Sequence, residues 1–358
     1  MPFWPLLASL NWPAIEVKAR EALADWVITA KVDAEILRRY RLVDERGALQ
    51  FGLLEPTGKG KALPVAFQAS KRGNFVLLTI LLRGTTPKGG RRLFLLTKTR
   101  PLKEPRPTPT LAVERRRSLV IVKTRYFEAT HDLTKGGTLT SVKFARSGRT
   151  WHLSMNDRLY RRDLGGFCLK FDRMGRLLKI ESGPLAAEIS FRARYFSPDG
   201  RPCPSGASAI YRYRYFATLP LVEVEAEIHQ ESPMMWDELH FLELRTKERF
   251  FGRFGMGPPI ECGMLIGSRK THSLRGKLWG ALFNSLDAVG LIGRRLYGIH
   301  DGLGDYGIYV HGPWLRWSGR EARFRTAIYL GPSGGDGSEV WKAGLRWLGG
   351  VDVSVLVP

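Results

Sequence analysis

The stretch YRYRYFATLPLVEVEAEI, residues 211–228, decides the fold class of this chain, because its side chains alternate strictly in character. On both sides of a short turn, every second residue is aromatic or aliphatic, and the residues between are mostly charged. A period of two is typical of a β-strand with one buried face. The turn places Arg214 opposite Glu223 and Arg212 opposite Glu225. We therefore predict an antiparallel hairpin with one ionic and one apolar face.

The ionic face of this hairpin has two interpretations. It is either a solvated ladder of ion pairs over a core, or part of a concave groove that binds sugar. A solvated ladder contributes only tenths of a kcal/mol per pair, on the order of 0.2–1 kcal/mol. The sequence leaves both interpretations open.

Strand signals continue on both sides of the hairpin, and they predict an all-β chain with few helices. An N-terminal β-sandwich is expected over residues 1–100, and RPLKEPRPTPTL, with four prolines, predicts a stiff linker over 101–111. Residues 112–358 carry consecutive strands, which favours one large antiparallel sandwich. Helices are expected only at 14–26 and at 338–350.

The charge of +22 favours an anionic partner, and it is uneven. Residues 51–150 hold 21 Lys and Arg against 5 Asp and Glu. The chain also has only four Asn and three Gln, which is typical of a protein that works at high temperature, so part of the charge can serve stability. No nucleic-acid-binding motif is present, so we expect no nucleic-acid partner.

Other classes of protein are disfavoured by what the sequence lacks. No apolar run approaches the roughly 20 residues that span a bilayer, so no membrane partner is expected. Three scattered cysteines predict neither a disulfide framework nor a zinc knuckle. The start, MPFWPLLASLNWP, lacks the basic region of a signal peptide. The compartment stays open between the cytoplasm and secretion with the signal removed, and so does the oligomeric state.

One segment after the linker carries a resemblance to a known group of proteins. YFEATHDLTKGGTLTSVKFARSGRTW, residues 126–151, resembles the opening of galactose-mutarotase-like β-supersandwich domains, chiefly through KGGTLTSV. The region around Gln68 is similar to a segment of some carbohydrate-active β-proteins. The resemblance implies a carbohydrate-active fold of the kind found in polysaccharide lyases, including rhamnogalacturonan exolyase-like proteins, and in some glycoside hydrolases. It implies no reaction by itself.

A lyase acting on a uronate-containing glycan would need a base, an acid and a cation that neutralises the carboxylate. Lyases of the resembled class commonly use His, Tyr and Arg. In HQESPMMWDELHFLELR, residues 229–245, Glu238 and His240 share a strand face, so the carboxylate could orient the imidazole. His240 or Tyr306 would be the base or acid, His300 the other partner, and Arg253 the carboxylate-binding cation.

Substrate-binding side chains are expected mainly on IHDGLGDYGIYVHGPWLRW, residues 299–317, which predicts a glycine-rich loop, a strand and a turn. An alternative is turn chemistry with core tryptophans. The expected substrate-binding residues are Asp301, Asp305, His311, Trp314, Trp236 and Arg249.

Three functions remain open from the sequence. The first is a polysaccharide lyase on an acidic glycan, and the second is a glycoside hydrolase with a pair of carboxylates on the same scaffold. The third is a non-catalytic glycan-binding module. Neither a cofactor nor a metal ion is expected; His300, Asp301 and Asp305 could hold a metal, but their spacing is unspecific.

Overall fold

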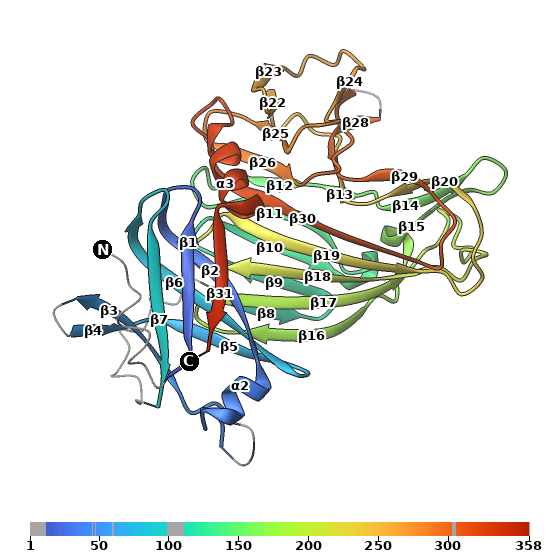
Figure 1. The fold of residues 1–358 in the computed structure, drawn as a ribbon. Helices are drawn as coiled ribbons and strands as arrows, with labels where there is room; N and C mark the ends of the chain where they lie inside the picture. The colour runs from blue at the N-terminus through green and yellow to red at the C-terminus, as the bar shows by residue number, and fades with distance from the viewer. Residues whose placement is uncertain are drawn as a thin grey trace. The chain divides into compact units, whose positions relative to one another are not determined.

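A computed structural model describes residues 12–44, 46, 48–58, 61–98, 111–302 and 306–357. The chain divides into two compact units (Figure 1). Unit 1 comprises Met1–Pro109, Gly183–Ala186 and Leu345–Pro358, and unit 2 comprises Thr110–Ser182 and Ala187–Gly344. The predicted linker at 101–111 lies outside the described residues, apart from Leu111.

The described residues of unit 1 form two β-sheets, and they include the short helix α2 (Ala34–Arg39). The first sheet contains, in spatial order, β31 (Val351–Leu356), β1 (Ala14–Ala19), β7 (Arg91–Thr97), β3 (Gly52–Gly58) and β4 (Lys61–Pro64). The second contains β2 (Leu23–Asp33), β6 (Phe75–Thr86) and β5 (Phe67–Arg72).

The helix predicted at 14–26 is wrong, because this segment forms β1 and the start of β2. Ile15 and Val17 are fully buried, while Lys18 between Val17 and Ala19 is exposed. That alternation has the period of a strand, and burial of its apolar face outweighs the helix propensity of the Ala, Glu and Lys residues.

The C-terminal end of the chain belongs to unit 1 rather than to the unit that precedes it. Strand β31 pairs antiparallel with β1, and Val353 lies opposite Val17. The predicted division at 112–358 placed this strand in the second domain. The helix predicted at 338–350 is confirmed as α3 (Ser338–Gly349).

In the described part of unit 2 there are four β-sheets. The largest contains β16 (Arg176–Ser182), β17 (Ala186–Arg194), β18 (Ser208–Phe216), β19 (Leu221–His229), β30 (Glu321–Pro332), β26 (Asp287–Ile292), β25 (Trp279–Phe283), β22 (Arg253–Gly257) and β23 (Glu261–Met264). A five-stranded sheet contains β12 (Thr150–His152), β11 (Thr138–Phe144), β10 (Phe127–Asp132), β9 (Leu119–Lys123) and β8 (Ala112–Arg116).

The two smaller sheets of unit 2 carry the candidate site. One contains β13 (Ser154–Met155), β21 (Glu243–Thr246), β28 (Gly307–His311), β27 (Gly298–Gly302) and β24 (Thr271–Ser273). The other contains β15 (Gly165–Cys168), β14 (Arg158–Arg161), β20 (Trp236–His240) and β29 (Trp314–Trp317). Two short 3-10 helices are η1 (Leu133–Lys135) and η2 (Leu169–Phe171). The predicted all-β architecture, a sandwich followed by a large antiparallel β-supersandwich, is confirmed.

The hairpin register predicted for residues 211–228 is confirmed. Arg214 lies opposite Glu223 and Arg212 opposite Glu225 in the pairing of β18 with β19. The alternate side chains, including Tyr213 and Tyr215, are buried in the core of unit 2. The alternation therefore fixed which face of this hairpin meets the core.

Two further observations concern the described residues as a whole. None of their helices has the length and apolar character needed to cross a membrane. Cys168, Cys203 and Cys262 are free thiols, and the first two are buried.

The KGG turn between β10 and β11 requires glycine because two different constraints act on Gly137. Its φ of +71° lies in the left-handed region, and a Cβ atom there would stand 2.6 Å from Cγ of Phe191. Gly148 has nearly the same φ, +70°, but a Cβ there would meet nothing within 4 Å.

Gly137→Ala should therefore destabilise the protein more than Gly148→Ala. The Gly148 variant bears only the left-handed strain, about 1–2 kcal/mol. The Gly137 variant adds overpacking against Phe191, about 1–3 kcal/mol more. Urea unfolding midpoints measure both losses. Equal midpoints for the two variants would contradict the packing argument.

His131, on β10, is a polar residue that is fully buried in the core of unit 2. Its Nδ1 donates to the carbonyl oxygen of Gly137 at 2.9 Å, and its Nε2 accepts from the Tyr215 hydroxyl at 2.5 Å. This arrangement requires a neutral ring. Burial lowers the pKa of His131 to about 4, although the Gly137 carbonyl opposes the shift.

Acid should therefore destabilise the protein through His131. Between about pH 6.5 and pH 4, His131 is protonated in the unfolded chain but stays neutral in the folded protein. The free energy of unfolding therefore decreases as the pH falls through this range, by on the order of 3 kcal/mol. Unfolding midpoints across this range should fall less steeply in His131→Gln than in the wild type. The variant keeps the acid dependence of other groups, so parallel curves would contradict the assignment.

Candidate functional site

At three neighbouring places the chain passes from one of the two smaller sheets of unit 2 to the other. We call these three adjacent crossings the junction. Strand β13 continues into β14 through Asn156 and Asp157, and β20 continues into β21 through Phe241 and Leu242. Strand β28 continues into β29 through Gly312 and Pro313. The crossings are tied together by backbone bonds, from Asn156 N to the Glu243 oxygen at 2.9 Å and from Gly312 N to the Leu242 oxygen at 3.1 Å.

The buried carboxylate of Asp157 stabilises the central crossing, at Phe241 and Leu242 between β20 and β21. Leu242 has a φ of +55°, a conformation that costs free energy for a branched side chain. Oδ1 of Asp157 accepts from the backbone N of Glu243 at 3.1 Å, and Oδ2 accepts from the Tyr211 hydroxyl. Burial raises the pKa of Asp157 to about 6, against the opposing effect of these bonds.

This crossing brings His240 and Glu243 to the same side. In a regular strand, residues three apart face opposite ways, but here Nδ1 of His240 lies 3.0 Å from Oε2 of Glu243. Nε2 of His240 lies 2.9 Å from Oε2 of Glu238, which also accepts from Arg158 at 2.7 Å. Two carboxylates therefore flank one imidazole.

Tyr306 and Asn156 extend this network toward the surface. The Tyr306 hydroxyl donates to Oε1 of Glu243 at 2.9 Å and accepts from Nδ2 of Asn156 at 2.8 Å and from Arg158 at 3.1 Å. Lys170 donates to Oδ1 of Asn156 at 2.6 Å. We call His240, Glu238, Glu243, Arg158, Tyr306, Asn156 and Lys170 the junction cluster.

Electrostatics separate the groups of the junction cluster into ionised carboxylates and a protonated phenol. The bond from His240 lowers the pKa of Glu238 to about 2. Burial acts to raise the pKa of Glu243, but the bond from His240 and neighbouring positive charge lower it to about 2. Burial, and then Glu243, raise the pKa of Tyr306 to about 12. Burial lowers the pKa of Lys170.

The junction cluster opens into a pocket of about 320 Å³, which we call the junction pocket. Its lining includes Arg158, Lys170, Arg245 and Tyr306, and among the described residues Glu238 is the one acidic residue that lines it. The guanidinium of Arg245 lies 4.4 Å from the ring centroid of Tyr306.

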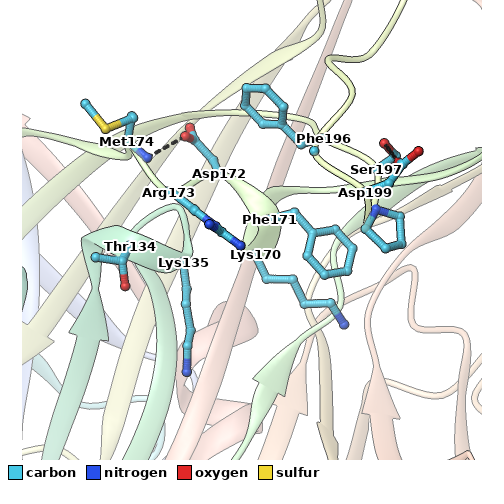
Figure 2. A pocket seen from close by; sticks show the side chains of 12 residues that line it. Thr134, Lys135, Lys170, Phe171, Asp172, Arg173, Met174, Phe196, Ser197 and Asp199 are labelled. Carbon is cyan, nitrogen blue, oxygen red and sulfur yellow. Dashed lines mark hydrogen bonds between the residues drawn. The ribbon is translucent and has the colours of Figure 1, made fainter.

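A second pocket of about 580 Å³ shares Lys170, Phe171 and Pro198 with the junction pocket. Figure 2 shows the Phe171 ring beside the Lys170 side chain, and Lys135 among the other side chains that line this second pocket. The Asp172 carboxylate accepts from the backbone N of Met174 and of Arg194, both at 2.8 Å, so it is engaged by its own chain. The two pockets together are rich in cations.

The structure brings only part of the predicted catalytic set together. His240, Tyr306 and Glu238 belong to the junction cluster. The His300 ring lies 6.3 Å from that of Tyr306, its Nδ1 lies 2.9 Å from the Thr271 hydroxyl, and it does not line the junction pocket. Arg253 lies outside the cluster, where it donates to the Gly335 carbonyl oxygen at 2.6 Å.

The predicted substrate-binding residues also divide. His311 is buried beside His240, with ring centroids 4.4 Å apart. Trp314 is 42% exposed and stays available to a ligand. Trp236 is fully buried and donates to Gln230, so it cannot stack on a sugar. Arg249 donates to the Leu265 carbonyl oxygen.

Asp301 has a structural role in the loop that precedes β24. Its carboxylate accepts from the backbone N of Ile266, Gly267 and Ser268 at 2.8–3.0 Å. Burial opposes the shift, but these bonds lower the pKa of Asp301. Asp305 lies outside the described residues.

Sequence reasoning missed Asn156, Arg158, Lys170, Glu243 and Arg245. One signal was available, because Asn156, Asp157 and Arg158 form a polar run between Met155 and Leu159, both buried. A polar run inside a buried strand indicates a break or a site. No signal in the sequence indicated that Glu243 would face His240.

Among the described residues, His240, Glu243 and His311 form the group that could hold a metal ion, with ligand atoms within 4.8 Å of one another. The predicted metal alternative of His300, Asp301 and Asp305 differs from this group.

The sequence matches no known protein family, and it matches no curated protein. Solved structures share its fold. An α-mannosidase from Enterococcus faecalis V583 has a TM-score of 0.59 at 9% identity over 96% of this chain and 46% of that one. A protein in the glycosyl hydrolase family 38, also from Enterococcus faecalis, has a TM-score of 0.54 at 7% identity over 98% and 48%.

A galactose mutarotase related enzyme from Lactobacillus acidophilus superposes less well, with a TM-score of 0.35 at 13% identity over 63% of this chain and 98% of that one. The chain spans about half the length of the two Enterococcus proteins. At these identities the likeness shows a shared fold. The part of the predicted resemblance that concerns polysaccharide lyases stays a prediction.

The hydrogen bonds of the Tyr306 hydroxyl should stabilise the folded protein. Tyr306→Phe removes three hydrogen bonds and leaves Oε1 of buried Glu243 with one partner fewer, so we expect a loss of about 1–3 kcal/mol in stability. The matched control is Tyr160→Phe, in the same pocket, whose hydroxyl makes no described hydrogen bond. Urea unfolding measures both, and an equal effect of the two variants would refute the network.

Proposed function

We propose that this chain is a carbohydrate-active protein that binds an acidic unit of a glycan in the junction pocket. The observation that carries the proposal is the convergence of Arg158, Lys170 and Arg245 on one opening beside Tyr306. Guanidinium and ammonium groups bind carboxylates and sulfates through charge-assisted hydrogen bonds. The net charge of +22 would draw such a ligand to the protein.

The neighbouring pocket supports a polymer rather than a single sugar. It adds Lys135 and Arg173 to the shared Lys170, so cations continue beyond the junction pocket. Phe171 offers an apolar ring between the two pockets, where the C–H face of a sugar ring could pack. Consecutive acidic units of one chain would therefore meet successive positive groups.

Hydrolysis is the reaction that the comparisons favour. Two solved structures with TM-scores above 0.5 are named as an α-mannosidase and as a protein of a glycosyl hydrolase family. In the junction pocket, ionised Glu238 would take a proton from the attacking water, and the Tyr306 hydroxyl would protonate the leaving oxygen. The bond between the anomeric carbon and that oxygen breaks as the bond to water forms.

Elimination from a uronate is a second candidate reaction. The lowered pKa of Lys170 is the observation that favours it. Burial lowers its pKa, and the nearby Arg245 acts in the same direction, so a larger fraction of the amine is free to take the C5 proton. Arg158 would hold the sugar carboxylate, and Tyr306 would protonate the leaving oxygen. Lys170 and Arg158 then take the roles that the sequence suggested for His300 and Arg253.

One digestion experiment separates these possibilities. The protein is incubated with polygalacturonate, alginate and neutral mannan, and new reducing ends and the absorbance of unsaturated uronate are followed together. Reducing ends without absorbance indicate hydrolysis, and both signals indicate elimination. Binding of acidic oligosaccharides without either product supports the third alternative, a glycan-binding module. Absence of binding to any acidic glycan would refute the proposal.

Lys170→Met tests whether the junction pocket is responsible. Loss of one partly buried charge-assisted contact should weaken binding of an acidic oligosaccharide about 10-fold or more, as measured by calorimetry. The matched control is Lys179→Met on β16, which does not line either pocket and should leave the affinity unchanged. Equal affinity of the two variants would place the ligand elsewhere.

A further inference from the structure

His311 is a buried histidine that lacks a hydrogen-bond partner. Its side chain is fully enclosed on β28, and neither Nδ1 nor Nε2 bonds to any described residue. A buried polar group without a partner costs on the order of 1–3 kcal/mol. In its neutral form the imidazole carries one N–H and one nitrogen lone pair, and neither has a partner among the described residues. Such a group calls for a ligand.

The free nitrogen faces two other metal-binding side chains. His240, Glu243 and His311 each offer one atom, and the three atoms lie within 4.8 Å of one another. Nδ1 of His240 lies 3.0 Å from Oε2 of Glu243, and the two imidazole rings have centroids 4.4 Å apart. Ligands bound at about 2 Å from zinc lie within about 4 Å of each other, so only a small contraction is needed.

We propose that His240, Glu243 and His311 bind one divalent transition metal ion of the zinc type. Two imidazoles and one carboxylate form a ligand set that suits zinc and leaves a position for water or another ligand. The site lies behind the junction pocket, and it stands on observations that are independent of any reaction there.

The surroundings of His240 fit the outer shell of a metal centre. When Nδ1 of His240 binds the metal, its Nε2–H donates to Glu238, whose carboxylate is fixed in turn by Arg158. A carboxylate behind a metal-bound histidine is the usual second partner of such a ligand. Asn156 and Tyr306 both bond Oε1 of Glu243, which leaves Oε2 for the metal.

A second proton on His240, in place of the metal ion, would not account for the unpartnered nitrogens of His311. A doubly protonated His240 would satisfy Glu238 and Glu243, since each ring nitrogen would then donate. That state leaves both nitrogens of His311 without a partner, and it sets a positive ring 4.4 Å from the His311 ring. The metal gives His311 a partner and needs only one proton on His240.

The test uses the full chain without a histidine tag. The protein is stripped with a chelator, dialysed against zinc and analysed for bound metal, and the cobalt-loaded form is examined for visible ligand-field bands. We expect one zinc ion per chain, visible bands with cobalt, and a higher unfolding temperature with metal than without. Less than stoichiometric metal in the wild type would overturn the proposal.

Variants separate the ligands from general effects of folding. His311→Phe fills the buried space without a polar group, so it should fold without metal and lose zinc binding and the cobalt bands. Glu243→Gln should weaken zinc binding about 10-fold or more, because an amide is a poorer ligand than a carboxylate. The control His272→Phe alters a half-buried histidine on β24 and should retain one zinc ion. Retention of zinc by His311→Phe would also overturn the proposal.

Discussion

The candidate site depends on one buried interaction, in which the Asp157 carboxylate accepts from the backbone N of Glu243 and from the Tyr211 hydroxyl. This interaction stabilises the left-handed conformation of Leu242, where β20 gives way to β21. A regular strand would send His240 and Glu243 to opposite faces. The free energy stored in the break is offset by the bonds to Asp157, and the result is a cluster of charged groups inside a sheet protein.

Charge compensation then determines what this cluster can do. Glu238 and Glu243 stay ionised because His240 and Arg158 lie against them, and Tyr306 keeps its proton. Both carboxylates are paired with groups of the protein itself. The junction pocket therefore presents mainly cations to a ligand. The same arrangement leaves one ligand atom each of His240, Glu243 and His311 within 4.8 Å of one another. The anionic glycan and the metal ion that we propose would therefore contact different parts of one network.

The sequence predicted the features that follow from local periodicity. The register of the 211–228 hairpin is confirmed because alternation and a short turn fix it together. The 14–26 segment was misjudged because helix propensity competed with a weak alternation that only burial decides. Within the site, His240, Glu238 and Tyr306 were predicted from residue type, whereas Glu243 requires knowledge of the break at Leu242. Lys170 and Arg158 reach the pocket through long-range pairing, which no local pattern reveals.

A crystal structure of the protein with an acidic oligosaccharide would test the proposed glycan site most directly. We predict sugar density in the junction pocket, with an acidic group of the ligand within hydrogen-bond distance of Arg158 or Lys170 and Phe171 against a sugar face. Density for the oligosaccharide over the ionic face of the 211–228 hairpin, with the junction pocket empty, would contradict it.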